Sequence, residues 1–107
     1  MSMMLTIVET PTFLRLASAI WVDDELTEFK VWLAGNALFG DVIPGTLGLR
    51  KVRWSRQGMG KRGCARVVYY NQLEDGRIVL LMAYTKSNFD NLPADFLLAL
   101  KKEFENA

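Results

Sequence analysis

The basic residues of this chain are concentrated in one stretch. Residues 49–70 read LRKVRWSRQGMGKRGCARVVYY, and between Arg50 and Arg66 they include seven of the thirteen lysines and arginines and no acidic residue. The rest of the chain has the other six basic residues (13 − 7) and all twelve acidic ones. The formal net charge of +1 is therefore the sum of about +7 on this segment and about −6 elsewhere. Guanidinium groups bind phosphate through paired hydrogen bonds, so this asymmetry favours a polyanionic partner. The competing interpretation is a solvated charged surface without a partner.

Cleavage of RNA is the chemistry that such a cluster could support. RNA carries its own nucleophile, the 2′-hydroxyl, so a protein needs only to align the phosphate, accept a proton and stabilise the negative charge of the transition state. The sequence has no histidine, so the proton carrier would be a lysine, tyrosine, aspartate or glutamate. Neighbouring arginines disfavour the charged form of a lysine, which makes Lys51, Lys61 and Lys86 candidates.

The cysteine and histidine content argues against other chemistries. A single cysteine, Cys64, excludes an internal disulfide, and without histidine there is no ligand set for a zinc site. We therefore expect no metal site and no cofactor. The glycines at 58, 60 and 63 do not form a phosphate-binding P-loop, because the required spacing and the following helix are missing.

Aromatic residues near the cations allow two interpretations. Unpaired RNA bases stack on exposed aromatic rings beside cationic groups. In most proteins such rings instead pack in the core or against a neighbouring strand. Both interpretations apply to four residues, Trp54, Tyr69, Tyr70 and Tyr84.

The first half of the chain predicts one strand and two helices. Residues 5–9 are rich in β-branched side chains, and Thr10 followed by Pro11 is typical of a helix start. A second helix is expected from Asp23, which could cap it, to Gly35. The next segment is rich in glycine and predicts a loop packed by Leu38, Phe39 and Ile43.

The second half predicts three strands and a helix. Residues 48–54, 65–72 and 77–84 are dense in β-formers and separated by glycine-containing turns, as in an antiparallel meander. Alternation places Lys51 and Arg53 on the same side of the first of these strands. After Pro93 a helix should turn four apolar side chains inward, those of Phe96, Leu97, Leu100 and Phe104. The whole chain, residues 1–107, is thus expected to form a single α+β domain.

The string GLRKVRWSRQGMGKRGCARVVYY, followed by an apolar strand ending in LLMAYTK, resembles the HigB-like branch of the RelE superfamily. These are the toxins of bacterial type II toxin–antitoxin systems. The resemblance implies a microbial-RNase-like α+β fold with an antiparallel sheet, two N-terminal helices and one C-terminal helix. It also implies a ribosome-dependent mRNA endoribonuclease (an mRNA interferase) that inhibits translation. The implied partners are mRNA, the ribosome and an antitoxin, often with a helix-turn-helix DNA-binding domain.

The resemblance also assigns roles to individual residues. It implies that Arg53 and Arg66 stabilise the developing charge and that Lys51 or Lys86 transfers a proton. The residues expected to contact RNA are Arg50, Arg56, Lys61, Arg62 and Tyr84. Cys64 stands where the pattern has glycine, so a left-handed backbone there would be strained. The alternative is a non-catalytic RNA- or ribosome-binding module that uses the same basic face. The chain has no apolar run of roughly 20 residues and no signal peptide, so we expect a cytoplasmic protein without membrane contact.

Overall fold

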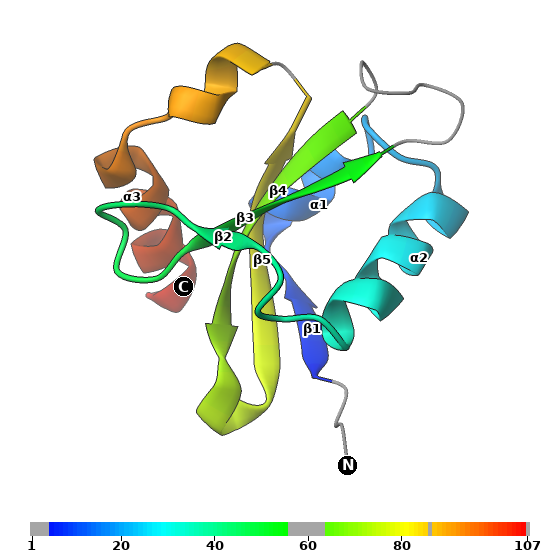
Figure 1. The fold of residues 1–107 in the computed structure, drawn as a ribbon, viewed down its shortest axis with the longest axis horizontal. Coiled ribbons are helices and arrows are strands. Elements are labelled where there is room, and N and C mark those ends of the chain that lie inside the picture. The colour runs from blue at the N-terminus through cyan, green and yellow to red at the C-terminus, as the bar shows by residue number, and fades with distance from the viewer. Residues whose placement is uncertain (1–4, 56–63, 86, 107) are drawn as a thin grey trace.

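The computed structural model describes residues 5–55, 64–85 and 87–106 and has an α+β architecture (Figure 1). Its elements are β1 (Thr6–Glu9), α1 (Pro11–Ala17), α2 (Asp23–Ala34), β2 (Asp41–Val42), β3 (Arg50–Ser55), β4 (Cys64–Gln72), η2 (Leu73–Asp75), β5 (Arg77–Tyr84), η3 (Ser87–Asn91) and α3 (Ala94–Glu105). The expected order of one strand, two helices, three strands and a helix is confirmed. The two-residue strand β2 and the short helices η2 and η3 are additions. No helix in the described part of the chain is long and apolar enough to span a membrane.

The five strands form one sheet in the order β1-β5-β4-β3-β2. Strands β2 to β5 are antiparallel, as expected for a meander. The first strand of the chain joins β5 in parallel, with Thr6 opposite Arg77, so the sheet is mixed. Parallel strands need a long connection, and here the rest of the chain between them supplies it.

One face of the sheet is covered by α1 and α2, on the opposite side from α3 (Figure 1). Phe13 and Ala17 of α1 and Phe29 and Leu33 of α2 are fully buried in this core. Trp54 of β3 packs against the edge of this core. Its ring centroid lies 5.3 Å from that of Phe29.

The other face is covered by α3, which contributes fewer buried residues. Leu97 is 3% exposed, while Leu98, Leu100 and Phe104 are partly buried against the sheet. Phe96 is 46% exposed, so the expectation that it packs inward is wrong. It lies in the first turn of α3, next to Leu97, and adjacent helical residues point in different directions.

The sequence correctly predicted the cap residue of α1 but not that of α2. Thr10 caps α1, because its Oγ1 accepts from the Phe13 amide at 3.1 Å, and Pro11 occupies the first turn. In α2 the N-cap residue is Val22, which makes no side-chain cap bond, and Asp23 is the first helical residue. The carboxylates at 23–25 still favour the positive end of that helix.

The segment between α2 and β3 departs from the packed loop that its sequence predicts. Leu38 and Phe39 are 64% and 66% exposed, so the expectation that they pack the loop is wrong, whereas Ile43 is partly buried. Gly40 is the residue that fits tightly. A Cβ there would meet the Tyr69 hydroxyl oxygen at 2.6 Å, so the close approach of Tyr69 requires glycine.

Candidate nucleic-acid interface

A row of polar side chains crosses the sheet near the start of β4 and the end of β5, on the face that α3 partly covers. Arg53 of β3 lies directly opposite Arg66 of β4, and Arg66 lies opposite Tyr84 of β5. Directly opposed side chains project to the same face of an antiparallel pair. Lys51 shares this face by alternation from Arg53, as the sequence predicted. Two arginines directly opposite each other repel, so an anion is needed to stabilise the arrangement.

A β-bulge in β5 turns Tyr84 toward this face. Val68 pairs with Met82 and Tyr69 with Leu80, so Leu81 is an extra residue without a partner on β4. Before the bulge Leu80 faces the α1 and α2 core, and after it Tyr84 faces the α3 side. Strict alternation from Leu80 would have put Tyr84 under α1 and α2.

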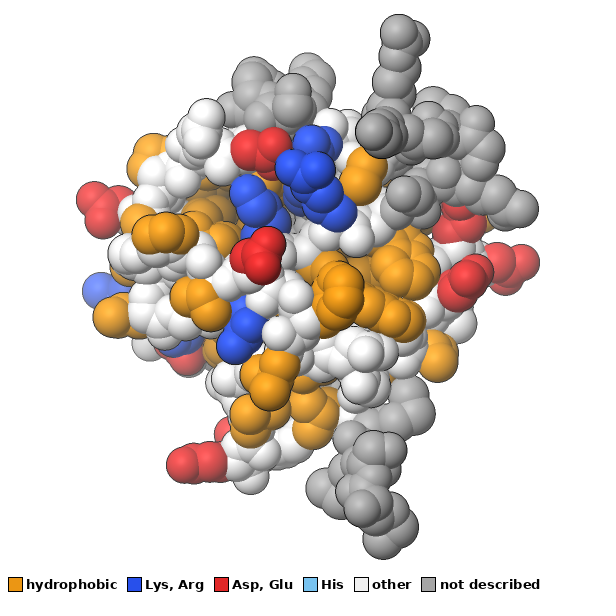
Figure 2. Space-filling model, viewed as in Figure 1, with side chains coloured by type: hydrophobic (Ala, Val, Ile, Leu, Met, Phe, Trp, Pro, Cys, Tyr) orange, Lys and Arg blue, Asp and Glu red, His pale blue; other side chains and the backbone are white. Residues whose placement is uncertain are grey.

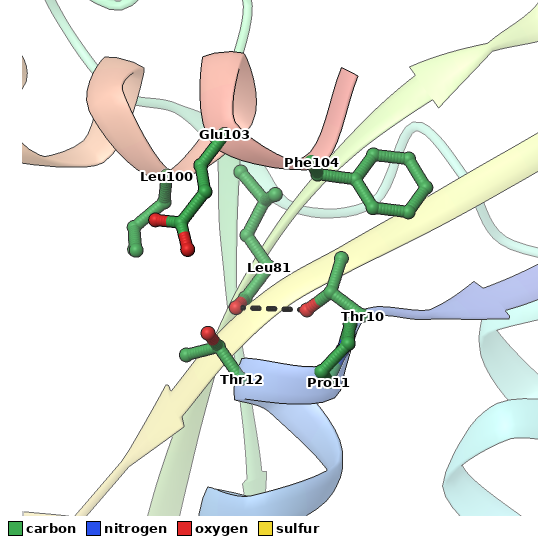
Figure 3. Close-up of a pocket in the computed structure, with 7 residues that line it drawn as sticks. All are labelled: Thr10, Pro11, Thr12, Leu81, Leu100, Glu103 and Phe104. Atoms are coloured by element: carbon green, nitrogen blue, oxygen red, sulfur yellow. Dashed lines mark hydrogen bonds between the residues drawn. The ribbon is translucent and has the colours of Figure 1, made fainter. Parts of the chain in front are cut away.

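Thr10 secures the bulge from the other end of the chain. Its hydroxyl points at the carbonyl oxygens of Leu80, at 2.9 Å, and Leu81, at 3.3 Å. Figure 3 shows the contact with Leu81 beneath Leu100 and Phe104 of α3, beside a cavity of about 100 Å³. None of the described cationic residues lines this cavity, which therefore lies outside the polar row.

The anion that stabilises the row is a carboxylate of the protein itself. Asp90, in η3, accepts a hydrogen bond from the Tyr84 hydroxyl at 3.0 Å. The same oxygen, Oδ1, lies 3.2 Å from Arg66 Nε and 3.9 Å from Lys51 Nζ. The Arg66 Nε–H is not aligned for a hydrogen bond, so this contact is an ion pair. These three contacts all involve Oδ1.

Arg66 is the most deeply held cation of the row. Its side chain is 11% exposed, and Nη1 donates to the carbonyl oxygens of Cys64 at 3.1 Å and Thr85 at 3.0 Å. The guanidinium is therefore fixed in direction before any ligand arrives, which lowers the entropic cost of binding.

Tyr84 is unsuited to accept a proton. Burial raises its pKa, and the hydrogen bond to the Asp90 carboxylate and the charge of that group raise it further. Arg66 and Arg53 act in the opposite direction but are outweighed. The phenol thus stays protonated at neutral pH and serves as a hydrogen-bond donor.

Arg53 and Lys51 are the more accessible cations of the row. Arg53 is exposed and forms no ion pair with any residue in the described ranges. Both line a hollow of about 340 Å³ with Phe39, Gly40, Asp41 and Val52. Figure 2 shows Lys and Arg side chains gathered on one face, with acidic side chains and a group of hydrophobic side chains beside them.

Arg50 does not join this group. Its Nη1 donates to the carbonyl oxygens of Gly40 at 2.6 Å and Leu38 at 3.2 Å, which holds the segment before β2. It alternates with Lys51 and therefore projects to the side of α2. An RNA contact by Arg50 stays a prediction.

The remaining candidates fall into two groups. Arg56, Lys61, Arg62 and Lys86 lie outside the described residues. The aromatic candidates Tyr69, Tyr70 and Tyr84 are buried and Trp54 packs on Phe29, which supports the packing interpretation of these four rings. An RNA contact by Tyr84 stays a prediction. Cys64 begins β4 and its φ is not positive, so the strain expected there does not arise.

The sequence did not point to two features of this face, the carboxylate of Asp90 and the exposed ring of Phe39. Asp90 stands in the mixed segment SNFDNLPAD, where no pattern singles it out. Within the described residues no group of three or more His, Cys, Asp or Glu side chains could hold a metal ion.

No protein-family model matches the chain. A solved structure of a double mutant of the E. coli toxin RelE in the free state has the same fold, with a TM-score of 0.65. The match covers 92% of this chain and 98% of that chain at 11% sequence identity. The chain therefore has a RelE-like fold, which confirms the expected fold class. An identity this low establishes the fold alone.

Proposed function

We propose that this chain is the toxin of a type II toxin–antitoxin pair, from the HigB-like branch of the RelE superfamily. It cleaves mRNA on the ribosome and so inhibits translation. The observation that carries the proposal is the convergence of Lys51, Arg53 and Arg66 on one face of the sheet, around a hydrogen-bonded Tyr84. The RelE-like fold and the absence of histidine are consistent with it.

The proposed reaction is a transesterification. The 2′-oxygen of a ribose attacks the adjacent phosphorus and loses its proton, while the bond from phosphorus to the 5′-oxygen of the next nucleotide breaks. The products are a 2′,3′-cyclic phosphate and a 5′-hydroxyl, which takes up a proton. Arg53 and Arg66 stabilise the extra negative charge on the phosphorus oxygens. Preorganised donors of this kind typically account for about 10²–10³-fold in rate each.

The proton carriers are proposed to be Lys51 or Lys86, with Asp90 as a further candidate. Asp90 presents a carboxylate whose Oδ1 is held by Tyr84 and Arg66, which orients its second oxygen. Tyr84 is excluded as the base by its raised pKa and instead holds Asp90.

The proposal extends to the rest of the basic segment and to partners. Arg56, Lys61 and Arg62 are proposed to contact RNA phosphates. The cognate antitoxin, with a helix-turn-helix domain, would cover the cationic face, and the pair would act in the cytoplasm. Each phosphate contact releases counterions, so RNA binding should weaken steeply with salt.

Arg53→Ala gives the cleanest test, because Arg53 is exposed and no described ion pair is lost with it. We expect cleavage of ribosome-bound mRNA, followed by mapping the new 5′ ends, to fall about 100-fold or more. Growth arrest on expression should be lost in parallel. The matched control is Arg15→Ala, an exposed arginine in the last turn of α1. Undiminished cleavage by Arg53→Ala would remove this assignment.

A second function, RNA or ribosome binding without cleavage, is favoured by one observation. Asp90 already neutralises part of the charge of Arg66, which lowers the field available to a transition state. This alternative predicts salt-sensitive RNA binding that Arg53→Ala weakens, with no new 5′ ends at any protein concentration.

A further inference from the structure

Phe39 presents an aromatic ring to solvent beside the cations. It is 66% exposed, although its neighbour in space, Trp32, contacts it edge-on with ring centroids 5.0 Å apart. Phe39 is one of the residues that line the hollow of about 340 Å³ beside Lys51 and Arg53. An exposed aromatic residue and two cations that line one hollow combine the elements that bind an unpaired base with its phosphate.

The backbone on either side of this ring is fixed. The Gly40 amide donates to the Tyr69 hydroxyl at 3.0 Å, and the Gly40 carbonyl accepts from Arg50 at 2.6 Å. Tyr69 itself is fully buried and donates to the Ala37 carbonyl at 2.8 Å. Phe39 and Asp41 therefore flank a residue held through both of its peptide groups, so the hollow exists before a ligand arrives.

Asp41 adds a carboxylate to the hollow. It pairs with Lys51 across β2 and β3, so both side chains project to the same face. A carboxylate would repel phosphate, but it accepts hydrogen bonds from the amino group of a base. Adenine, cytosine and guanine carry such a group, whereas uracil does not.

We propose that this hollow binds one unpaired RNA base, stacked on Phe39, with its phosphate on Arg53 and Lys51. Asp41 accepts from the amino group of the base and so disfavours uracil. Phe39 and Asp41 are thus specificity residues of the proposed RNA-cleavage site, and the inference rests on that function.

The test is a binding titration with single-stranded oligonucleotides whose riboses are 2′-O-methylated, so that they cannot be cleaved. The probes are oligoadenylate, oligocytidylate, oligouridylate and an abasic chain of the same length. Phe39→Ala should weaken binding of the oligoadenylate about tenfold and leave the abasic chain unchanged. Phe39→Trp should bind the oligoadenylate at least as tightly as wild type, because its ring restores stacking. The matched control is Leu38→Ala, an exposed apolar residue that does not line the hollow.

The Asp41→Asn variant tests the base preference. Wild-type protein should bind oligoadenylate and oligocytidylate more tightly than oligouridylate, and Asp41→Asn should reduce that difference. Equal binding of all three by the wild type would overturn the role of Asp41.

The outcomes separate this inference from the function on which it rests. If Arg53→Ala weakens the binding of every probe and Phe39→Ala weakens the binding of none, the base site is refuted and the RNA-binding face stands. If the wild type binds neither the oligonucleotides nor ribosome-bound mRNA, both are refuted. If Phe39→Ala leaves RNA binding intact but abolishes binding of a partner protein, the ring is a protein contact and the inference is overturned. Unchanged urea unfolding of each variant shows that the fold is intact.

Discussion

The ion pair between Asp90 and Arg66 makes a strong prediction about stability. In Asp90→Asn the side chain keeps an oxygen that can accept from Tyr84, but the negative charge is lost. Arg66 is 11% exposed and Asp90 22% exposed, so Arg66 is left with a poorly solvated, uncompensated charge. A hydrogen bond to a charged group, such as that of Tyr84 to Asp90, contributes about 1.5–3 kcal/mol, and removing one partner of a buried ion pair costs about 3–5 kcal/mol.

Both side chains retain some solvent, so we expect a loss near the lower of these ranges. The free energy of unfolding should fall by about 2 kcal/mol, which lowers Tm by about 8 °C for a domain of this size. Urea denaturation monitored by circular dichroism gives the free energy, and calorimetry gives Tm. The control is Glu28→Gln, an exposed position in the middle of α2, where a change within about 0.5 kcal/mol is expected.

The same variant should bind RNA more tightly. Removing the carboxylate releases Arg66 and Lys51 from an internal competitor, so affinity should rise and the salt dependence should steepen. An Asp90→Asn protein that matches the wild type in both stability and salt dependence would refute the argument that Asp90 neutralises this face. Tighter RNA binding combined with lost cleavage would identify Asp90 as a proton carrier.

Three further predictions concern the supports of the site. Burial raises the pKa of all three tyrosines, Tyr69, Tyr70 and Tyr84. The folded state therefore disfavours the phenolate more than the unfolded chain does. The free energy of unfolding should be unaffected below pH about 10 and fall above it. Tyrosinate absorbance should therefore appear only with unfolding, and a tyrosine that ionises at an ordinary pH in folded protein would contradict this. Gly40→Ala places a Cβ 2.6 Å from the Tyr69 hydroxyl and should cost about 1–3 kcal/mol in urea denaturation, whereas Gly35→Ala, with its nearest contact at 3.8 Å, should not. Thr10→Val removes the bond to the Leu80 carbonyl and the cap of α1 and should cost about 1–3 kcal/mol; a loss under 0.5 kcal/mol would show that the bulge does not depend on Thr10.

The parts of the fold that depend on local pattern could be predicted from the sequence. Alternation put Lys51 and Arg53 on one side of β3, and the density of β-formers at 77–84 correctly marked β5. The Thr10-Pro11 pair correctly marked the start of α1. In each case the signal lies within a few residues of the feature it determines.

The features that could not be predicted depend on contacts far apart in sequence. Strict period-two alternation misplaces Tyr84, because the bulge at Leu81 is specified by its partner strand and by Thr10. The role of Asp90 arises only when η3 is brought beside β4, and no local pattern reports that approach. Phe39 is apolar and was expected to pack, but it is 66% exposed, and its ring contact is with Trp32 of α2.

The parallel pairing of β1 with β5 has a consequence for the timing of synthesis. Thr6 can pair with Arg77, and Thr10 can donate to the Leu81 carbonyl, only after β5 has been synthesised. Contacts between such distant parts of a chain form late in folding. In a polypeptide still emerging from a ribosome, Lys51 and Arg53 of β3 are therefore present before Tyr84 and Asp90 can take their places beside them. The assembled face is a property of the finished molecule, and a partner made beforehand could bind it at the moment it first forms.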